Sequence, residues 1–506
     1  MDKTLKTILE EAIGRRVVWD SRFGVYAVYC LEEEADKIGE SKKTEKYFSY
    51  TFASVRNNHG FLNFKPTLKG IEHGLKFALQ GKFNFPSTSL GTSGKKVQVE
   101  FISANPTGPL TLGNGRGGVY GDVLANILEK AGRDVEKEYY VNDTGGQVEI
   151  LGHSVLKDDK AEYKGEYIDE LNKKFSEGDP KEIGEKSAEI ILESIKKTVA
   201  SMGINFDVWF SEKKDLRDKG KVDEIINWFK EKDLTYEKDD ALWFKASEFG
   251  DREDRVLVKK DGEPTYFAVD CAYHKNKFEE RKFDKVINVW GADHHGDVAR
   301  MNGFVEALGY KDNFEIVLMQ FVRLMEKGET KRMSKRKGVF VLVDDVLKEI
   351  GKDAFRYFML TRSSDTHMDF DLELAKEQSK KNPVYYIQYA GARMQNILEK
   401  SRASNLKSKT ISNIEILNSK HEKGLVLKLI QFPEIIEDIS KSYQVHQLAT
   451  YAYELAKIFT DFYENVRVLE TEDGELKTAR LELVAISRQV LGNVLKIMGV
   501  SSPKKM

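Results

Sequence analysis

The spacing of apolar and polar residues predicts a strand, a turn and a helix near residue 100. Apolar and polar side chains alternate over residues 97–101, which predicts a half-buried strand, and the turn-forming residues 105–109 follow it. After a glycine-rich run at 115–118, apolar residues recur at helical spacing up to Gly132. Unpaired N–H groups at a helix start, beside glycines that let a ligand approach the backbone, favour an anion. The stretch is therefore a candidate phosphate site, although most such turns only close a strand–helix unit.

Strand-like and helical segments alternate over residues 95–362, which predicts a parallel sheet with crossover helices. Further strands of this sheet are expected at 135–141, 255–258 and 286–290. The segment 152–205 is rich in lysine and glutamate at amphipathic helical spacing. We therefore expect a helical insertion there, with a solvated charged face.

Two smaller regions flank the predicted sheet. The first 88 residues are expected to contain a helix over 3–13, a helical stretch over 29–37 and a strand over 60–64. From residue 372 to the end the pattern is almost wholly helical. The predicted fold class is α/β: a Rossmann-like parallel-sheet domain over 89–371, with a small α/β N-terminal domain over 1–88 and an all-α C-terminal bundle over 372–506.

The strand predicted over 60–64 has an outward face with possible chemistry. If Leu62 and Phe64 face the core, Phe61 and Asn63 face outward. An exposed aromatic ring beside an amide suits stacking on, and hydrogen bonding to, an unpaired RNA base. An ordinary pair of surface residues has the same pattern, so both interpretations stay open at this point.

Composition sets limits on compartment and partners. The 506 residues carry 80 basic and 82 acidic side chains, so any nucleic-acid contact needs a local basic patch. The two cysteines, Cys30 and Cys271, are far apart, which argues against a disulfide framework or a cysteine-rich metal site. No apolar stretch approaches the ~18 residues of a membrane span, and the N-terminus lacks a signal-peptide core. A cytoplasmic location is expected.

A second candidate phosphate site is the basic loop at 331–338, with the sequence Lys-Arg-Met-Ser-Lys-Arg-Lys-Gly. Six cations fall between Lys327 and Lys337, and Glu329 is the one acidic residue among them. Such a cluster repels itself unless an anion sits nearby, and a triphosphate would satisfy it. In a lysine-rich chain the alternative is a solvated basic loop.

Taken together, the two candidates resemble the nucleotide-binding signatures of class I aminoacyl-tRNA synthetases, a His-x-Gly-His turn and a Lys-Met-Ser-Lys loop. Thr111-Leu112-Gly113-Asn114 corresponds to the turn and Met333-Ser334-Lys335 to the loop. Further segments make the resemblance closest to bacterial arginyl-tRNA synthetases; they are residues 103–110, 138–143, 206–212, 265–274, 290–296 and 382–386.

The chain departs from the family pattern at the turn. Thr111 and Asn114 stand where the family has two histidines, and the lysine loop begins with Arg332. Threonine and asparagine still donate hydrogen bonds to phosphate oxygens, but neither carries the positive charge of a protonated histidine. A catalytically impaired tRNA-binding paralogue is therefore the alternative to an active enzyme.

The resemblance implies arginine–tRNA ligase activity: L-arginine and ATP give arginyl-adenylate, and arginine then passes to the 3'-terminal adenosine of tRNA(Arg), with release of AMP and pyrophosphate. ATP is expected to bring Mg²⁺ with it, and no dedicated protein metal site is expected. The implied catalytic residues are Thr111, Asn114 and Lys335. The implied ATP-binding residues are Gly113, Gly115, Gly291, Asp293, Met333, Ser334 and Lys335.

The amino-acid pocket has a physical requirement. Guanidinium is planar, always charged and presents five donors, so its pocket needs carboxylates. By resemblance, Glu100, Tyr266 and Asp270 hold the guanidinium, and Tyr266 and Asp270 share one face if their segment is helical. Asn105 and His294 are implied to orient the α-amino and carboxylate groups. Pairing of Glu100 with a local arginine, or capping of a helix by Asp270, would be structural alternatives.

The flanking regions acquire RNA-binding roles from the same resemblance. The C-terminal bundle resembles the anticodon-binding domain of the family, and Phe61 and Asn63 lie where bacterial relatives contact the tRNA D-loop. Tyr385, Arg393 and Arg467 are further candidate RNA contacts. The partners implied are tRNA(Arg), L-arginine and ATP, without a membrane, and a monomer is expected.

Overall fold

A computed structural model describes residues 3–20, 24–31, 34–35, 38, 45–56, 59–83, 85, 95–326, 329–330, 341–402 and 410–506. Contacts divide the chain into two units. The sheet unit consists of Gly94–Ala125 and Arg133–Lys376. The terminal unit consists of Met1–Ser93, Asn126–Gly132 and Glu377–Met506.

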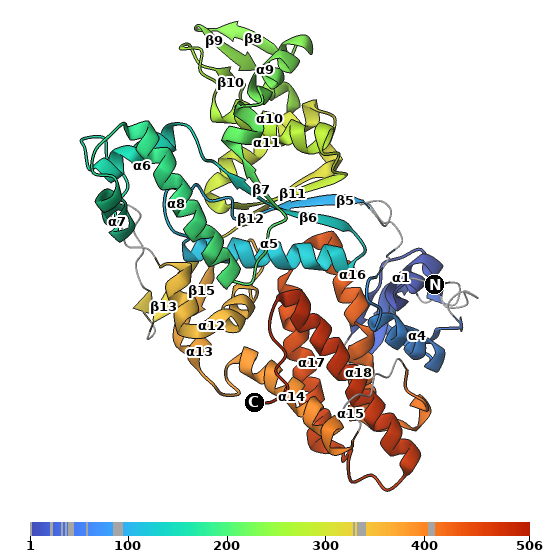
Figure 1. Cartoon of the computed structure of the whole chain (residues 1–506). Coiled ribbons are helices and arrows are strands. Elements are labelled where there is room, and N and C mark those ends of the chain that lie inside the picture. Colours follow the sequence, from blue (N-terminus) through green and yellow to red (C-terminus); the bar gives the residue numbers. More distant parts are fainter. Residues whose placement is uncertain are drawn as a thin grey trace. The chain divides into compact units, whose positions relative to one another are not determined.

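The sheet unit contains the parallel sheet that the sequence predicts. Its five strands lie in the order β12-β11-β5-β6-β7, and every neighbouring pair is parallel. Their bounds are β5 Lys96–Glu100, β6 Asp134–Val141, β7 Val208–Ser211, β11 Lys285–Gly291 and β12 Phe314–Met319. Figure 1 shows α5 (Leu112–Lys130) along one face of this sheet, with α10 (Tyr266–Lys275) and α11 (Val298–Ala307) on the other. The strands predicted at 135–141 and 286–290 are confirmed.

The prediction that the first strand is half-buried was wrong. Gln98 and Glu100 are buried, as are the apolar residues that alternate with them along the strand. The reason is that β5 is the central strand of a sheet covered by helices on both faces, where alternation does not mark a solvent side. Inside the core the amide nitrogen of Gln98 donates to Glu138 at 2.6 Å.

The strand predicted at 255–258 exists, but it does not belong to the parallel sheet. β10 (Arg255–Val258) pairs antiparallel with β9 (Ala241–Phe244), which in turn pairs with β8 (Thr235–Lys238). Asp239 and Asp240 join β8 to β9, both with positive φ, as a tight hairpin turn requires. A further sheet has the order β14-β13-β15, with bounds β13 Val322–Glu326, β14 Glu329–Thr330 and β15 Met368–Asp371.

The glycine-rich run at 115–118 lies inside α5 instead of before it, because the helix already begins at Leu112. A Cβ atom on Gly115 would lie 2.7 Å from the Phe355 ring, and one on Gly118 would lie 2.8 Å from Ile102. Both distances are shorter than real side chains tolerate. These glycines therefore allow α5 to pack closely against its neighbours.

The remaining helices of the sheet unit include the predicted insertion. The segment is helical as expected, and its long helix α8 buries Ile183, Ile191 and Ile195 while its charged residues face solvent. The helical bounds are α6 Gly146–Leu156, α7 Glu166–Lys174, α8 Pro180–Ser201, α9 Lys221–Glu231, α12 Val343–Met359 and α13 Leu372–Lys376.

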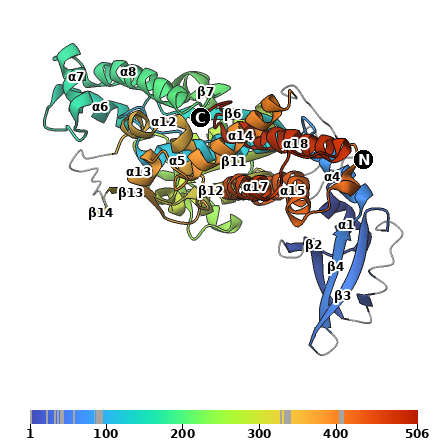
Figure 2. The same cartoon turned by 90° about the horizontal axis from the view of Figure 1, so that it is seen from below.

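The terminal unit combines a small antiparallel sheet with a helical bundle. Figure 2 shows the sheet, whose order is β1-β2-β4-β3. Its bounds are β1 Val18–Asp20, β2 Val25–Leu31, β3 Phe48–Arg56 and β4 His59–Pro66, with helices α1 Leu5–Ile13 and α4 Leu68–Ala78. The helix at 3–13 and the strand at 60–64 are confirmed, but the helical stretch predicted from Tyr29 was wrong at its start because Tyr29 lies in β2.

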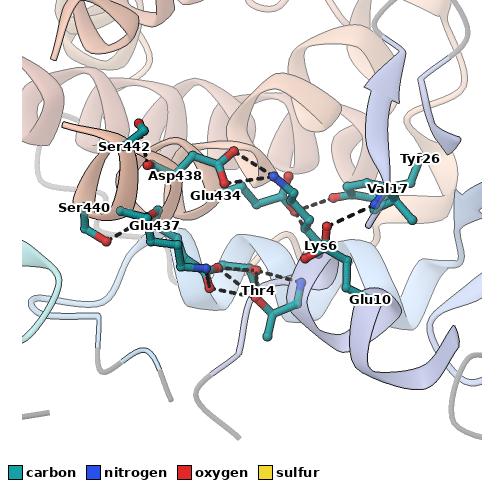
Figure 3. Close-up of polar contacts among 12 residues, drawn as sticks. Thr4, Lys6, Glu10, Val17, Tyr26, Glu434, Glu437, Asp438, Ser440 and Ser442 are labelled. Carbon is teal, nitrogen blue, oxygen red and sulfur yellow. Dashed lines mark hydrogen bonds and ion pairs between the residues drawn. The ribbon is translucent and has the colours of Figure 1, made fainter. Parts of the chain in front are cut away.

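The C-terminal part of this unit is helical, as predicted. The bounds are α14 Pro383–Lys400, α15 Lys420–Ile430, α16 Phe432–Ser442, α17 His446–Asn465 and α18 Gly474–Met498. Carboxylates of α16 hold the start of α1 (Figure 3): Thr4 donates to Glu437 at 2.8 Å, and the Lys6 ammonium is 2.8 Å from Asp438. Thr4 and Glu437 are buried, so this contact is part of the core of the terminal unit.

Candidate active site

The Thr-x-Gly-Asn turn forms the start of α5. The side-chain oxygen of Asn114 accepts from the Thr111 N–H at 3.0 Å and from the Thr111 hydroxyl at 2.8 Å. Within the described part of the chain, the Asn114 amide nitrogen and the N–H groups of Gly113 and Asn114 have no partner. Free donors at the N-terminus of a long helix favour an anion, so the turn can bind phosphate without the two histidines.

Two sequence-predicted ATP-binding positions differ in surroundings. Gly113 is exposed at the helix start, whereas Gly115 is buried against Phe355 and Val343. The packing of Gly115 accounts for the absence of a side chain there without a ligand. Met333, Ser334 and Lys335 lie outside the described residues.

The described residues that follow the basic loop are bonded to the turn. The Leu112 N–H donates to the Val341 carbonyl at 2.9 Å, and the Val343 N–H donates to the Leu110 carbonyl at 3.0 Å. Thr111 and Leu342 form an isolated antiparallel bridge between them. Residues 341–343 are therefore fixed to the turn, which lies more than two hundred residues earlier in the chain.

Arg116 makes a second connection between distant segments. Its guanidinium is almost fully buried and donates to the carbonyls of Gln320, Ser363 and Thr366 at 2.7, 2.7 and 3.0 Å. Burial lowers the pKa of Arg116 to about 10. Because these carbonyls lie next to β13 and β15, Arg116 fixes the small β13–β15 sheet to the start of α5.

The backbone after β5 is strained. Ile102 and Ser103 have φ angles of 68° and 39°, and a β-branched residue rarely adopts such a conformation. The Ser103 hydroxyl donates to Glu100 at 2.9 Å and accepts the Tyr140 N–H at 3.1 Å, which holds the turn in place. Asn105 follows this turn, and its amide donates to Gln147 of α6.

Glu100 is buried at the carboxyl end of β5 and has a cationic partner. The Lys277 ammonium lies 2.6 Å from its second carboxylate oxygen, while the first accepts from Ser103. The structural alternative paired Glu100 with a local arginine. Glu100 does have a cationic partner, but this partner is a lysine 177 positions away. Lys277 was missed by sequence reasoning; its one signal is that it follows Asp270 by seven residues, two helical turns on the same face.

Tyr266 and Asp270 lie in α10, so the helical spacing assumed from the sequence is confirmed. Thr265 caps this helix, accepting from Ala268, which excludes Asp270 as the cap. Tyr266 is exposed at the first turn, whereas Asp270 lies one turn deeper. Within the described residues no side chain forms an ion pair or hydrogen bond with the Asp270 carboxylate.

The surroundings of Asp270 are acidic. Burial raises the pKa of Asp270 to about 7, and the negative charges of Glu212 and Glu100 add to this rise. Arg300 opposes it, but Arg300 is itself paired with Asp297, which adds to the rise. An unpaired carboxylate among other carboxylates is the environment that a cationic side chain would stabilise.

Gly291 is the last residue of β11, and Asp293 and His294 follow it, next to the end of β5. A Cβ atom on Gly291 would lie 2.3 Å from a carboxylate oxygen of Asp293, so a larger residue there would displace the Asp293 side chain. His294 is exposed, and its Nδ1 lies 3.0 Å from Asp297. Carboxyl ends of neighbouring parallel strands meet at one edge, which is where α/β sheets bind ligands.

The candidate RNA contacts lie on the terminal unit. Phe61 is 43% exposed, and its ring contacts that of Tyr29, directly across the strand pair and 54% exposed. Asn63 is half-buried on the same strand. The sequence pattern predicts Phe61 and Asn63 as RNA contacts but not Tyr29, because it predicts a helical stretch over 29–37.

The aromatic residues of the bundle divide into core and surface. Tyr385 stacks on Tyr389 at 6.3 Å, and the Arg393 guanidinium lies over the rings of Tyr389 and Tyr463 at 4.7 and 4.3 Å. Arg467 is exposed and paired only with Glu470 among the described residues at ion-pair distance. Arg393 is therefore held between two rings, while Arg467 lies at the surface in an ion pair with Glu470.

Other site types receive no support from the described residues. They bring together no group of three or more His, Cys, Asp or Glu side chains that would hold a metal ion. None of the helices that the structure describes has the length and apolar character needed to cross a membrane.

Comparison with known proteins decides the family. Residues 155–378 match the family described as tRNA synthetases class I (R), catalytic domain, and residues 387–506 match the DALR anticodon binding domain. An arginine–tRNA ligase from Carboxydothermus hydrogenoformans is 45% identical over 440 residues, which cover 82% of this chain and 78% of that protein. The chain belongs to the arginyl-tRNA synthetase family.

Two further comparisons agree with membership of the arginyl-tRNA synthetases. An arginine–tRNA ligase from Caldanaerobacter subterraneus is 44% identical over 475 residues, 88% of this chain and 84% of that protein. The Thermus thermophilus arginyl-tRNA synthetase structure superposes with a TM-score of 0.78 at 21% identity, covering 99% of each chain. At that identity the likeness shows the fold alone, and it confirms the predicted class I α/β architecture.

Proposed function

We propose that this arginyl-tRNA synthetase family member is an active arginine–tRNA ligase, forming arginyl-adenylate from L-arginine and ATP and transferring arginine to tRNA(Arg). The observation that carries the proposal is Asp270. Its carboxylate lies among other carboxylates, its pKa is raised to about 7, and no described residue pairs with it. A guanidinium supplies the missing charge and enough donors for a buried acidic site.

The pocket residues then take separate tasks. Asp270 and Tyr266 on α10 bind the guanidinium, and Glu100 contributes from the end of β5. Asn105 and His294 orient the α-amino and carboxylate groups. The position of Asn105 after the strained turn at Ile102 supports this assignment, because such strain is retained where a fixed geometry is needed.

The first reaction needs no nucleophilic side chain, because the carboxylate of arginine attacks the α-phosphate of ATP and pyrophosphate leaves. The protein has to align the two reactants and stabilise charge on the phosphates. We assign this task to Thr111, Asn114 and the start of α5, together with Lys335 of the basic loop. ATP enters as its Mg²⁺ complex; Gly113, Gly291 and Asp293 contact the nucleotide.

The second reaction transfers arginine to the terminal adenosine of tRNA. In the proposed scheme residues 372–506 bind the anticodon region and residues 1–88 contact the D-loop through Phe61 and Asn63. Tyr385, Arg393 and Arg467 are the bundle contacts. The protein is proposed to act as a monomer in the cytoplasm.

The test is aminoacylation with purified protein, ATP, Mg²⁺, tRNA(Arg) and a panel of labelled amino acids. Charging with arginine, and none with lysine or citrulline, is expected. Reactions without ATP are the control. Binding of tRNA without any charging would instead show an impaired tRNA-binding paralogue, and charging with another amino acid would overturn the pocket assignment.

A further inference from the structure

Lys277 is a lysine with no contact to solvent, at the junction of α10 and the π-helical turn Asn276–Glu280. Its ammonium lies 2.6 Å from Glu100 and 3.1 Å from the side-chain oxygen of Asn288 in β11. The Tyr273 ring lies 4.1 Å away. A buried cation is retained only with close partners, and these contacts supply them.

The lysine fixes both the charge and the direction of Glu100. One carboxylate oxygen accepts from Lys277 and the other from Ser103, so each oxygen of Glu100 has a donor that favours this orientation. Asn288 is held in turn by a contact of its amide with His274 at 2.9 Å. The arrangement joins the end of β5 to β11 and α10 through side chains alone.

A count of charges shows what the pair does to the pocket. Three other carboxylates act on Asp270 there: Glu212, Glu100 and Asp297. Glu212 is paired with Arg217 at 2.7 Å, Glu100 is paired with Lys277, and Asp297 is paired with Arg300. Asp270 is left as the one carboxylate of the four without an ion-pair partner among the described residues. The pocket therefore holds one uncompensated negative charge.

We propose that Lys277 is a specificity-determining positioning residue, which neutralises and orients Glu100 so that the pocket presents one free carboxylate, Asp270, to one monocationic side chain. The proposal rests on the proposed arginine–tRNA ligase function. Lys277 itself does not touch the substrate and acts through Glu100. Without it, Glu100 would be a buried carboxylate with no cation beside it, and the pocket would lose its fixed acceptor geometry.

The experiment is a double-mutant cycle on the full-length protein with Lys277→Met, Glu100→Gln and the double variant. Lys277→Met is expected to raise the KM for arginine at least about tenfold and to change the KM for ATP by less than about twofold. In the Glu100→Gln background the same substitution is expected to have little further effect, because the residue through which it acts is already neutral.

Lys285→Met is the matched control. Lys285 is a second buried lysine of the sheet unit, bonded to the Asp312 carbonyl and Glu315 at the other end of β11. Lys285→Met should not change the KM for arginine more than the KM for ATP. Circular dichroism establishes whether each variant is folded. If Lys277→Met is not folded, Lys277→Arg and the double variant carry the test. Recovery of the folded state in the double variant supports the proposal.

The outcomes separate this inference from the function on which it rests. If the unmodified protein does not charge tRNA with arginine, the proposed function fails. If it does, but Lys277→Met raises both KM values equally, or has the same effect with and without Glu100, the role of Lys277 in specificity is overturned.

Discussion

The Tyr26 hydroxyl of β2 donates a hydrogen bond to Glu434 of α16, and the same carboxylate oxygen accepts the Lys6 N–H of α1 at 3.2 Å. Tyr26 and Glu434 are both buried (Figure 3). The pair joins the N-terminal sheet to the helical bundle inside the terminal unit. Burial raises the pKa of Glu434 to about 8, although Tyr26 and Lys6 favour the charged form and only Asp438 adds to the rise.

The stability of the terminal unit should therefore fall as the pH rises. The pKa of Glu434 is near 4.5 when unfolded and about 8 when folded, so between these values the folded state holds the extra proton. The free energy of unfolding is then largest below about pH 5 and decreases up to pH 8, by at most about 1.4 kcal/mol per unit. Urea unfolding at pH 6, 7 and 8 measures the slope.

Glu434→Gln should remove most of this slope, because the amide does not titrate. Ser442→Ala is the matched control on the same helix; it removes an exposed hydroxyl that donates to the Asp438 carbonyl and should keep the slope. A slope that is equal in Glu434→Gln and the unmodified protein would assign the pH dependence to other groups.

Arginine binding should improve as the pH rises through neutrality. The pKa of Asp270 is about 7 in the protein without substrate, and its protonated form does not pair with guanidinium. The KM for arginine should therefore rise roughly tenfold per unit below pH 7, while the KM for ATP stays nearly constant. Initial rates between pH 5.5 and 8.5 give both profiles.

Asp270→Asn provides the companion measurement. The KM for arginine should rise by about 10²-fold or more, far more than the KM for ATP, and should lose its dependence on pH. Equal changes in both constants would indicate a structural aspartate.

The pattern of apolar and polar residues predicted which segments form strands better than it predicted which strand residues are exposed. Alternation gave the right faces in β4, where Phe61 faces outward and Leu62 is buried, because that sheet has a solvent side. The same rule failed for Gln98 in β5, which is buried and donates a hydrogen bond to Glu138. Burial of a polar residue depends on a partner elsewhere in the chain, and the local alternation of apolar and polar residues does not reveal that partner.

The candidate site shows the same division. Thr111, Asn114 and Asp270 are predicted site residues because short motifs contain them, and their roles stay predictions. Lys277 is in no such motif, since its ion pair with Glu100 forms only when the turn after α10 packs against the sheet. Local rules also misplaced the glycine-rich run, because the close approach at Gly115 is to Phe355, which is distant in sequence.

Lys335 should be required for turnover. By resemblance it stabilises charge on the phosphates, so Lys335→Ala should reduce kcat by at least about 10²-fold. Lys348→Ala on the exposed face of α12 is the control, because it removes a lysine at the surface without touching the basic loop. Single-turnover aminoacylation separates the chemical step from product release. Unaltered turnover in Lys335→Ala would remove this lysine from the mechanism.

Tyr29 should contribute to tRNA binding together with Phe61. The two rings contact each other across β2 and β4 and are both exposed, so they form a surface on which an unpaired base can stack. Base stacking is worth about 1–3 kcal/mol, so Tyr29→Ala and Phe61→Ala should each raise the KM for tRNA about five- to a hundredfold. The KM for arginine should be unchanged. Val18→Ala, at an exposed position of β1, is the control, and equal KM values for tRNA in all three variants would exclude this face from tRNA recognition.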